Sequence, residues 1–245
     1  MSMGTRKTTL ITALDLEPAS AAMAAVDAIG DQCLWYKVGF RLFCEEGPSC
    51  VRFLKDRGKK VFLDLKFHDI PNTVATAIEA CADYGVDMLN VHASGGSEML
   101  RAAAAAVRKL KADGKPAPLL IAVTVLTSLD AAALGEALNR CDGYSPAQHV
   151  PHLALMAKDA GLDGVVCSAH EIALVRAACG DGFTLVIPGI RPSGAALDDQ
   201  KRVMTPAKAA AAGADFIVVG RPVYQAPDPA AAAAAVNAEL EEACR

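Results

Sequence analysis

The sequence contains no run of eighteen consecutive apolar residues, although 53% of its 245 residues are hydrophobic. A membrane-spanning helix needs about 20 such residues, so we expect no membrane segment and no membrane partner. Residues 1–7 hold neither the apolar core nor the cleavage pattern of a secretory signal peptide. Together these absences lead us to expect a cytoplasmic protein.

Spacings typical of metal or disulfide frameworks are also missing. The eight cysteines include no Cys-x-x-Cys pair, and most lie among apolar residues, as in Val165-Val166-Cys167. This pattern is typical of small buried thiols in a reducing compartment. The five histidines show no H-x-x-x-H or H-x-H spacing, so the sequence carries no metal signature.

Basic residues form no cluster, and the formal net charge is -4. We therefore expect no nucleic acid as the main partner, because such proteins carry a basic patch. A small anionic ligand remains compatible with this charge, since it needs only a local positive pocket.

Eight short apolar segments recur along the chain, and each is followed by a helical pattern. The predicted strands are 9–14, 33–40, the first half of 60–73, 88–93, 119–126, 164–168, 184–187 and 216–219. The predicted helices are 18–29, 42–57, 71–84, 98–111, 130–138, 146–160, 171–179, one that begins at Pro206 after the cap Thr205, and 229–243.

Such strand–helix units, about 25 to 30 residues each, predict an α/β fold, a (β/α)₈ TIM barrel that fills residues 1–245 as one domain. The alternative is a doubly wound open sheet. That fold usually has a glycine-rich turn after its first strand, whereas this chain has Asp15-Leu16-Glu17-Pro18 there. The barrel is the preferred prediction.

Charged residues lie at several predicted strand ends, where a barrel forms its active site. In the third strand, Asp64 and Lys66 alternate with apolar residues and therefore project together from one face. Asp69 follows where the strand ends. Asp15 and Lys37 add a carboxylate and an amine from the first two strands.

An alternating set of lysines and carboxylates keeps each lysine protonated and each aspartate ionised. A protonated lysine held in this way can deliver a proton to a carbanion. The structural alternative is an ion pair between Asp64 and Lys66, with Asp69 near the N-terminus of the next helix. For His68 and His92 we favour structural roles over catalytic ones.

The seventh and eighth units indicate a phosphate site, because phosphate commonly binds the loops after strands 7 and 8 of this fold. These loops offer Arg191, Gln200, Gly220 and Arg221. Arginine gives a two-pronged donor for phosphate oxygens, and glycine lets the backbone approach. The segment 192–200 is a candidate lid. The alternative is that both arginines are solvated loop residues.

The stretch Asp64-Leu65-Lys66-Phe67-His68-Asp69-Ile70-Pro71-Asn72-Thr73 resembles the signature of the orotidine 5'-monophosphate decarboxylase family in its bacterial form. Further motifs follow the family's order: Ala13-Leu14-Asp15, Lys37-Val38-Gly39, Leu89-Asn90-Val91-His92-Ala93, Leu126-Thr127-Ser128, Pro188-Gly189-Ile190-Arg191-Pro192, Asp199-Gln200-Lys201-Arg202 and Val219-Gly220-Arg221-Pro222. The resemblance implies decarboxylation of orotidine 5'-monophosphate to UMP, in pyrimidine biosynthesis, without a cofactor or metal.

The resemblance also implies the catalytic residues. Lys66 is expected to protonate C6 of the pyrimidine, and Asp64 to lie beside the departing carboxylate. Lys37 and Asp69 are expected to complete the array, with Asp69 reaching across from the second subunit of a homodimer that shares its active sites.

The remaining implied residues bind the substrate. Asp15 and Lys37 are expected to bind ribose hydroxyls, and Thr127 to contact the pyrimidine. The partner's copy of Thr73 is expected to assist, and Arg191, Gln200, Gly220 and Arg221 to hold the phosphate. Asp64, Ile70 and Pro188 complete the predicted pocket. Two rival functions remain: a magnesium-dependent sugar-phosphate lyase or decarboxylase, and a non-catalytic barrel that binds a phosphorylated ligand.

Overall fold

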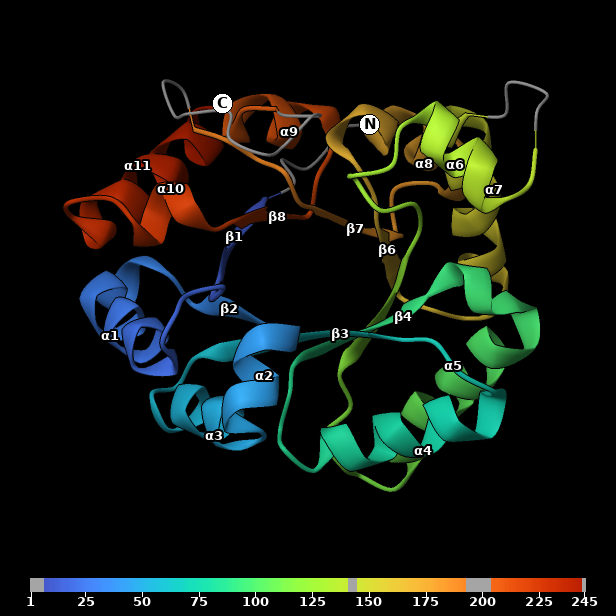
Figure 1. Cartoon of the computed structure of the whole chain (residues 1–245), viewed down its shortest axis with the longest axis horizontal. Helices are drawn as coiled ribbons and strands as arrows, with labels where there is room; N and C mark the ends of the chain where they lie inside the picture. Colours follow the sequence, from blue (N-terminus) through green and yellow to red (C-terminus); the bar gives the residue numbers. More distant parts are fainter. Residues whose placement is uncertain (1–6, 141–144, 193–203, 244–245) are drawn as a thin grey trace.

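A computed structural model describes residues 7–140, 145–192 and 204–243 of the chain. Eight parallel strands form a closed barrel in sequence order, and β1 pairs with β8 to close it (Figure 1). The strands are β1 (Thr9–Ala13), β2 (Trp35–Gly39), β3 (Lys60–Phe67), β4 (Met88–His92), β5 (Leu119–Val123), β6 (Gly164–Val166), β7 (Thr184–Ile187) and β8 (Phe216–Val219). The predicted (β/α)₈ barrel is confirmed.

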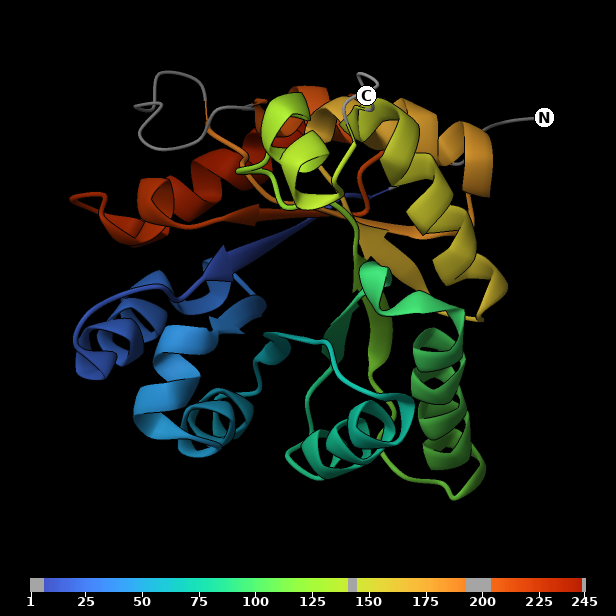
Figure 2. The same ribbon diagram turned by 45° about the vertical axis from the view of Figure 1, so that its right-hand side comes forward.

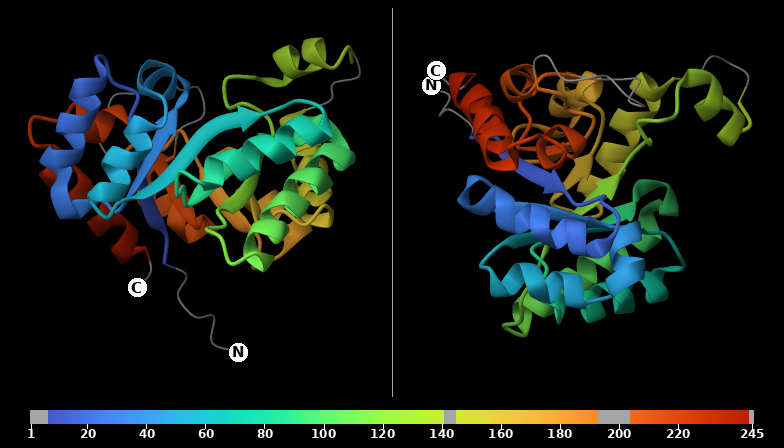
Figure 3. Two further views of the ribbon diagram at one scale, coloured as in Figure 1. Left: turned by 90° about the horizontal axis from the view of Figure 1, so that it is seen from below. Right: turned by 60° about the vertical axis from the view of Figure 1, so that its left-hand side comes forward.

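Helices surround the barrel on its outside, as three further views confirm (Figures 2 and 3). They are α1 (Ala19–Ile29), α2 (Phe40–Glu46), α3 (Ser49–Asp56), α4 (Pro71–Ala82), α5 (Gly96–Ala112), α6 (Ala131–Ala137), α7 (Pro146–Asp159), α8 (Ile172–Cys179), α9 (Pro206–Ala212), α10 (Arg221–Tyr224) and α11 (Pro229–Glu242). Within the described ranges, no helix is long and apolar enough to cross a membrane.

The prediction of one helix over 42–57 was wrong, because the chain forms α2 and α3 there. Gly47 ends α2 with a φ of +57°, a conformation that favours glycine. Pro48 follows and has no backbone N–H to continue a helix. Two short helices therefore pack where one long helix was expected.

The fifth strand ends at Val123, three residues before its predicted end. Val123 pairs with Val166, which is the last residue of β6, so the ladder has no further partner on that side. The residues after Val123 thus form a loop at the barrel mouth.

The barrel interior contains one apolar layer beneath the polar mouth. Its buried side chains come from seven strands and are Ile11, Ala13, Trp35, Phe62, Met88, Ile121, Val186 and Val218. Strand side chains alternate between faces, so the next inward position lies two residues further along each strand. That step leads from Ala13 to Asp15, from Trp35 to Lys37, and from Phe62 to Asp64. The candidate site therefore lies directly above buried apolar side chains of the barrel interior.

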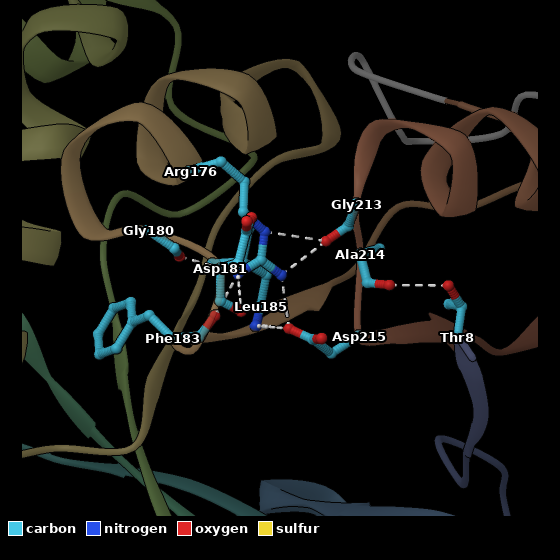
Figure 4. A network of polar contacts seen from close by, with 9 residues as sticks. All are labelled: Thr8, Arg176, Gly180, Asp181, Phe183, Leu185, Gly213, Ala214 and Asp215. Carbon is cyan, nitrogen blue, oxygen red and sulfur yellow. Dashed lines mark hydrogen bonds and ion pairs between the residues drawn. The ribbon is translucent and has the colours of Figure 1, made fainter. Parts of the chain in front are cut away.

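The opposite end of the barrel is held by aspartates that precede even-numbered strands. Asp87, Asp163 and Asp215 each accept the backbone N–H of a residue at the start of the preceding odd strand, at 2.7–2.8 Å. Arg176 of α8 adds an ion pair to Asp215 and donates to nearby carbonyls, including that of Gly213 (Figure 4). These contacts lie far from the strands' C-terminal ends.

Candidate active site

Four charged side chains form a row across the mouth of the barrel, with alternating sign. Lys37 Nζ lies 3.1 Å from Asp15 Oδ1 and 3.3 Å from Asp64 Oδ2. Lys66 Nζ lies 2.7 Å from Asp64 Oδ1. Three adjacent strands supply the row: Lys37 lies within β2, Asp64 and Lys66 lie within β3, and Asp15 lies two residues after the end of β1. The predicted cluster is therefore brought together by the structure.

The charge of Lys37 is maintained by its neighbours. Burial lowers the pKa of this lysine, but the carboxylates of Asp64 and Asp15 outweigh that effect and raise it above the ordinary value. Lys37 is hence an ammonium at neutral pH. The side chain of Asp64 is only 10% exposed. The ammonium groups of Lys37 and Lys66 contact its two oxygens and balance the cost of burying the carboxylate.

Strand β3 departs from regular geometry at Lys66, which has a φ of +45°. A left-handed conformation costs a residue with a side chain roughly 1–2 kcal/mol. The pairing with β4 also shifts register between Leu63 and Phe67. The predicted alternation therefore holds through Asp64, and a local irregularity then sets the backbone of Lys66.

Asn90 of β4 contacts this irregular segment and was not among the predicted site residues. Its Nδ2 donates to Asp64 Oδ1 at 2.6 Å, and its Oδ1 accepts the backbone N–H of Lys66 at 2.7 Å. One signal for it is present in the sequence: an amide at the inward position between the apolar residues Leu89 and Val91.

An apolar cavity of about 160 Å³ adjoins the charged row. Its walls combine three charged residues of the row with loop and strand residues from the far side of the barrel. The lining residues are Lys37, Phe62, Asp64, Lys66, Val123, Val125, Leu126, Thr127, Val166, Cys167, Val186, Pro188 and Val218. Lys66 lies at the wall of this cavity, whose low-polarity lining strengthens the field of nearby charges.

A second, more polar cavity of about 370 Å³ lies beside the first and shares Lys37, Pro188 and Val218 with it. It is lined by Ala13, Asp15, Lys37, Pro188, Gly189, Arg191, Val218, Gly220, Arg221 and Tyr224. Two guanidinium groups and a glycine backbone are groups that bind a phosphate. Tyr224 was not predicted; its hydroxyl donates to the Asp15 carbonyl at 3.5 Å. The predicted residue Gln200 lies outside the described residues.

Three predicted residues lie in or just after the turn between β3 and α4. Asp69, Ile70 and Thr73 are all exposed, and Ile70 is 67% exposed. The Asp69 carboxylate accepts the N–H of Ile70 at 2.6 Å. Neither cavity lining, as far as the described residues define it, includes any of the three. A single chain thus does not place them in the charged row.

His68 and His92 lie near each other, with ring centroids 5.6 Å apart, and His92 is close enough to Lys66 to be affected by its charge. Burial lowers the pKa of His92, and the nearby His68 and Lys66 lower it further. His92 is therefore neutral at pH 7. Within the described ranges, no group of three or more histidine, cysteine or acidic side chains is arranged to hold a metal ion.

A closed (β/α)₈ barrel, with a charged row and an arginine-lined cavity at its C-terminal mouth, defines a TIM-barrel enzyme with a site for an anionic small molecule. Residues 8–236 match the model of the Orotidine 5'-phosphate decarboxylase / HUMPS family, and the chain belongs to this family. The family predicted from the sequence motifs is confirmed.

Individual relatives agree with this assignment. The chain is 52% identical over 239 residues to an orotidine 5'-phosphate decarboxylase from Moorella thermoacetica, covering 96% of this chain and 93% of the relative. It is also 52% identical to one from an Enterobacter species, over 94% and 92% of the two chains. A crystal structure of the Lactobacillus acidophilus orotidine 5'-phosphate decarboxylase superposes with a TM-score of 0.83 at 39% identity, covering 95% and 99%.

Proposed function

We propose that this chain is an orotidine 5'-phosphate decarboxylase, which converts orotidine 5'-monophosphate to UMP and CO₂ in pyrimidine biosynthesis. One observation carries the proposal: the row Asp15–Lys37–Asp64–Lys66 lies beside an arginine-lined cavity. The named relatives, about half identical over most of the chain, support the same activity. The site of action is then the cytoplasm, where pyrimidine nucleotides are made.

The reaction breaks the bond between C6 of the pyrimidine and the carboxylate carbon. The electron pair stays on C6, and a vinyl carbanion of this kind has no conjugated acceptor for its charge. Lys66 then gives its Nζ proton to C6 and becomes a neutral amine, while CO₂ leaves without charge. A preorganised ammonium in a water-poor chamber supplies the stabilisation that such a carbanion needs.

Asp64 has two roles in this proposal. Its Oδ1 holds Lys66 Nζ at 2.7 Å, which keeps the proton donor charged and directed. Its negative charge also lies beside the position of the substrate carboxylate. Two like charges at about 4 Å repel by roughly 4 kcal/mol at an effective dielectric near 20. That repulsion ends when neutral CO₂ departs.

The remaining contacts bind the nucleotide. Arg191, Arg221 and the Gly220 backbone hold the phosphate, together with Gln200. Asp15 and Lys37 bind the ribose hydroxyls between the two cavities. Thr127 contacts the pyrimidine, and Pro188 lines the pocket. Phosphate binding far from C6 helps to close the site, so it raises turnover as well as affinity.

We further propose a homodimer in which each site receives Asp69, Ile70 and Thr73 from the partner subunit. The support is that these residues are exposed in one chain, next to the mouth but outside both cavities. Phe40 is 55% exposed, and Ile70 is more exposed still. Large apolar side chains at such a place mark an association surface. Asp69, which completes the proposed catalytic set of Lys66, Asp64 and Lys37, then enters from across this surface.

Metal chelation separates this function from a magnesium-dependent lyase on the same barrel. We expect purified protein to consume orotidine 5'-monophosphate, followed by its ultraviolet absorbance, at the same rate with and without EDTA. Activity lost on chelation and restored by magnesium would favour the lyase. A protein that binds UMP but gives no absorbance change under either condition would instead be the non-catalytic binding barrel.

A further inference from the structure

We infer that Asn90 is a positioning residue for the proposed proton transfer, because it holds both Asp64 and Lys66 in their working geometry. This inference rests on the proposed function. Asn90 is fully buried, at 0% exposure, although its side chain is polar. Buried polar groups need partners, and this amide finds both of its partners on β3.

The two hydrogen bonds differ in direction, and the neutral amide meets both. Nδ2 donates to the Asp64 carboxylate at 2.6 Å, whereas Oδ1 accepts from the Lys66 backbone at 2.7 Å. A carboxylate accepts only, and an N–H donates only, so the two neighbours fix the orientation of the amide. An apolar side chain of the same size removes the acceptor of the Lys66 N–H and one of the two donors to Asp64 Oδ1, which keeps only Lys66 Nζ.

The backbone bond replaces a missing part of the β3–β4 ladder. Leu63 pairs with Leu89 and Phe67 pairs with Val91, so three residues of β3 lie opposite one residue of β4, which is Asn90. The Asn90 side chain accepts the N–H of Lys66 within this irregular segment. It thereby stabilises the left-handed backbone of Lys66, at φ +45°.

That backbone conformation bears on the direction of the Lys66 side chain. With Lys66 in this conformation, Nζ returns to Asp64 Oδ1, the same oxygen that accepts from Asn90. Asn90 therefore acts on the proton donor twice, through the donor's main chain and through its carboxylate partner. Asn90 is not itself among the described residues that line either cavity, so its action is indirect.

The variant Asn90→Leu tests this inference. We expect kcat to fall by about 10²-fold, the effect of misplacing a reacting group by about 1 Å. The dissociation constant for UMP should change less than about threefold. The matched control is Thr8→Val, which removes another buried side-chain hydrogen bond, to the Ala214 carbonyl, at the opposite end of the barrel. It should retain wild-type kcat.

The variant Asn90→Asp gives a readout that a merely structural role does not move. An ionised Asp at position 90 repels the Asp64 carboxylate. The other titratable groups around it are Lys37, Lys66 and His92. Once protonated, it again has one donor and one acceptor. We therefore expect its kcat, divided by the wild-type kcat at each pH, to rise as pH falls from 8 to 5. Should the leucine variant not fold, this ratio carries the test alone.

Each result bears on a different statement. A wild-type chain without turnover overturns the proposed function and this inference with it. An active wild type combined with Asn90→Leu kcat within twofold of it overturns the inference alone. A ratio of Asn90→Asp kcat to wild-type kcat that does not change with pH also overturns the inference alone. A reduced kcat with preserved UMP binding, and a ratio that rises in acid, supports the positioning role.

Discussion

At the scale of single residues, the site depends on how closely its charged groups approach one another. Gly39 ends β2 beside the row, and a Cβ there would lie 3.0 Å from Lys37 Nζ and 3.1 Å from Asp15 Oδ1. Both atoms are ends of flexible side chains and can move by a few tenths of an ångström. The backbone φ of Gly39, −94°, also suits alanine.

We therefore predict that Gly39→Ala folds normally but lowers kcat/KM by about tenfold, because displaced charges stabilise the transition state less well. Steady-state kinetics and thermal unfolding measure the two effects. The matched control is Gly182→Ala, where an added Cβ meets nothing within 4 Å. Unchanged kinetics in Gly39→Ala would show that the spacing of Lys37 and Asp15 is not critical.

Strand periodicity was enough to predict that Asp15, Lys37 and Asp64 meet, whereas Lys66 reaches Asp64 from an irregular part of β3. Asn90 was missed for a physical reason: its role depends on an irregularity at Lys66, on another strand. Alternation within one strand does not reveal where a neighbouring ladder shifts register. The available signal was the amide of Asn90 between the apolar residues Leu89 and Val91, since an isolated polar group in an apolar strand needs a partner.

At the scale of elements, the β3–α4 turn decides whether one chain makes a complete site. In the proposed dimer, the turn gives Asp69 to the partner's site, while Lys66 of β3 stays in its own. The two residues are only three positions apart, yet they serve different sites. This geometry allows a complementation test.

We predict that Lys66→Ala and Asp69→Asn, each inactive alone, regain activity when unfolded together and refolded as a mixture. Random pairing makes half the dimers mixed, and one of the two sites in each mixed dimer has both native residues. Activity should approach about a quarter of wild type. Mixing either variant with itself is the control. No recovery, although mixed dimers are detected by mass spectrometry, would place Asp69 within its own chain's site.

Helix boundaries were less predictable than strands because they depend on local backbone geometry. The stretch from Leu42 to Arg57 has continuous helical character, but Gly47 and Pro48 interrupt it. Recognising that pair as a stop signal would have corrected the prediction. Pro71, in contrast, was correctly expected at the start of α4, where its fixed φ suits the first turn.

At the scale of the whole molecule, stability and chemistry are divided between the two ends of the barrel. The segments Gly85-Val86-Asp87, Gly161-Leu162-Asp163 and Gly213-Ala214-Asp215 share one arrangement. In each, a glycine with positive φ precedes a buried apolar residue and an aspartate that bonds to the adjacent strand. This repeat supports the regular barrel that eight apolar segments predicted.

We predict that Arg176→Ala lowers the free energy of unfolding by about 3 kcal/mol, since it leaves Asp215 without its partly buried ion partner. Chemical denaturation measures this, and kcat at 25 °C should stay at the wild-type value. Arg57→Ala is the matched control, because its ion pair with Asp27 is much more exposed. Equal destabilisation by both variants would contradict the special role of Arg176.

In the proposed reaction, Lys66 protonates C6 in a site that binds nucleotide through other residues. The most direct measurement compares Lys66→Ala with wild type in two assays, decarboxylation of orotidine 5'-monophosphate and calorimetric binding of UMP. We predict that turnover falls by at least about 10³-fold, while UMP affinity stays within about tenfold. Normal decarboxylation by the folded Lys66→Ala variant would contradict the claim.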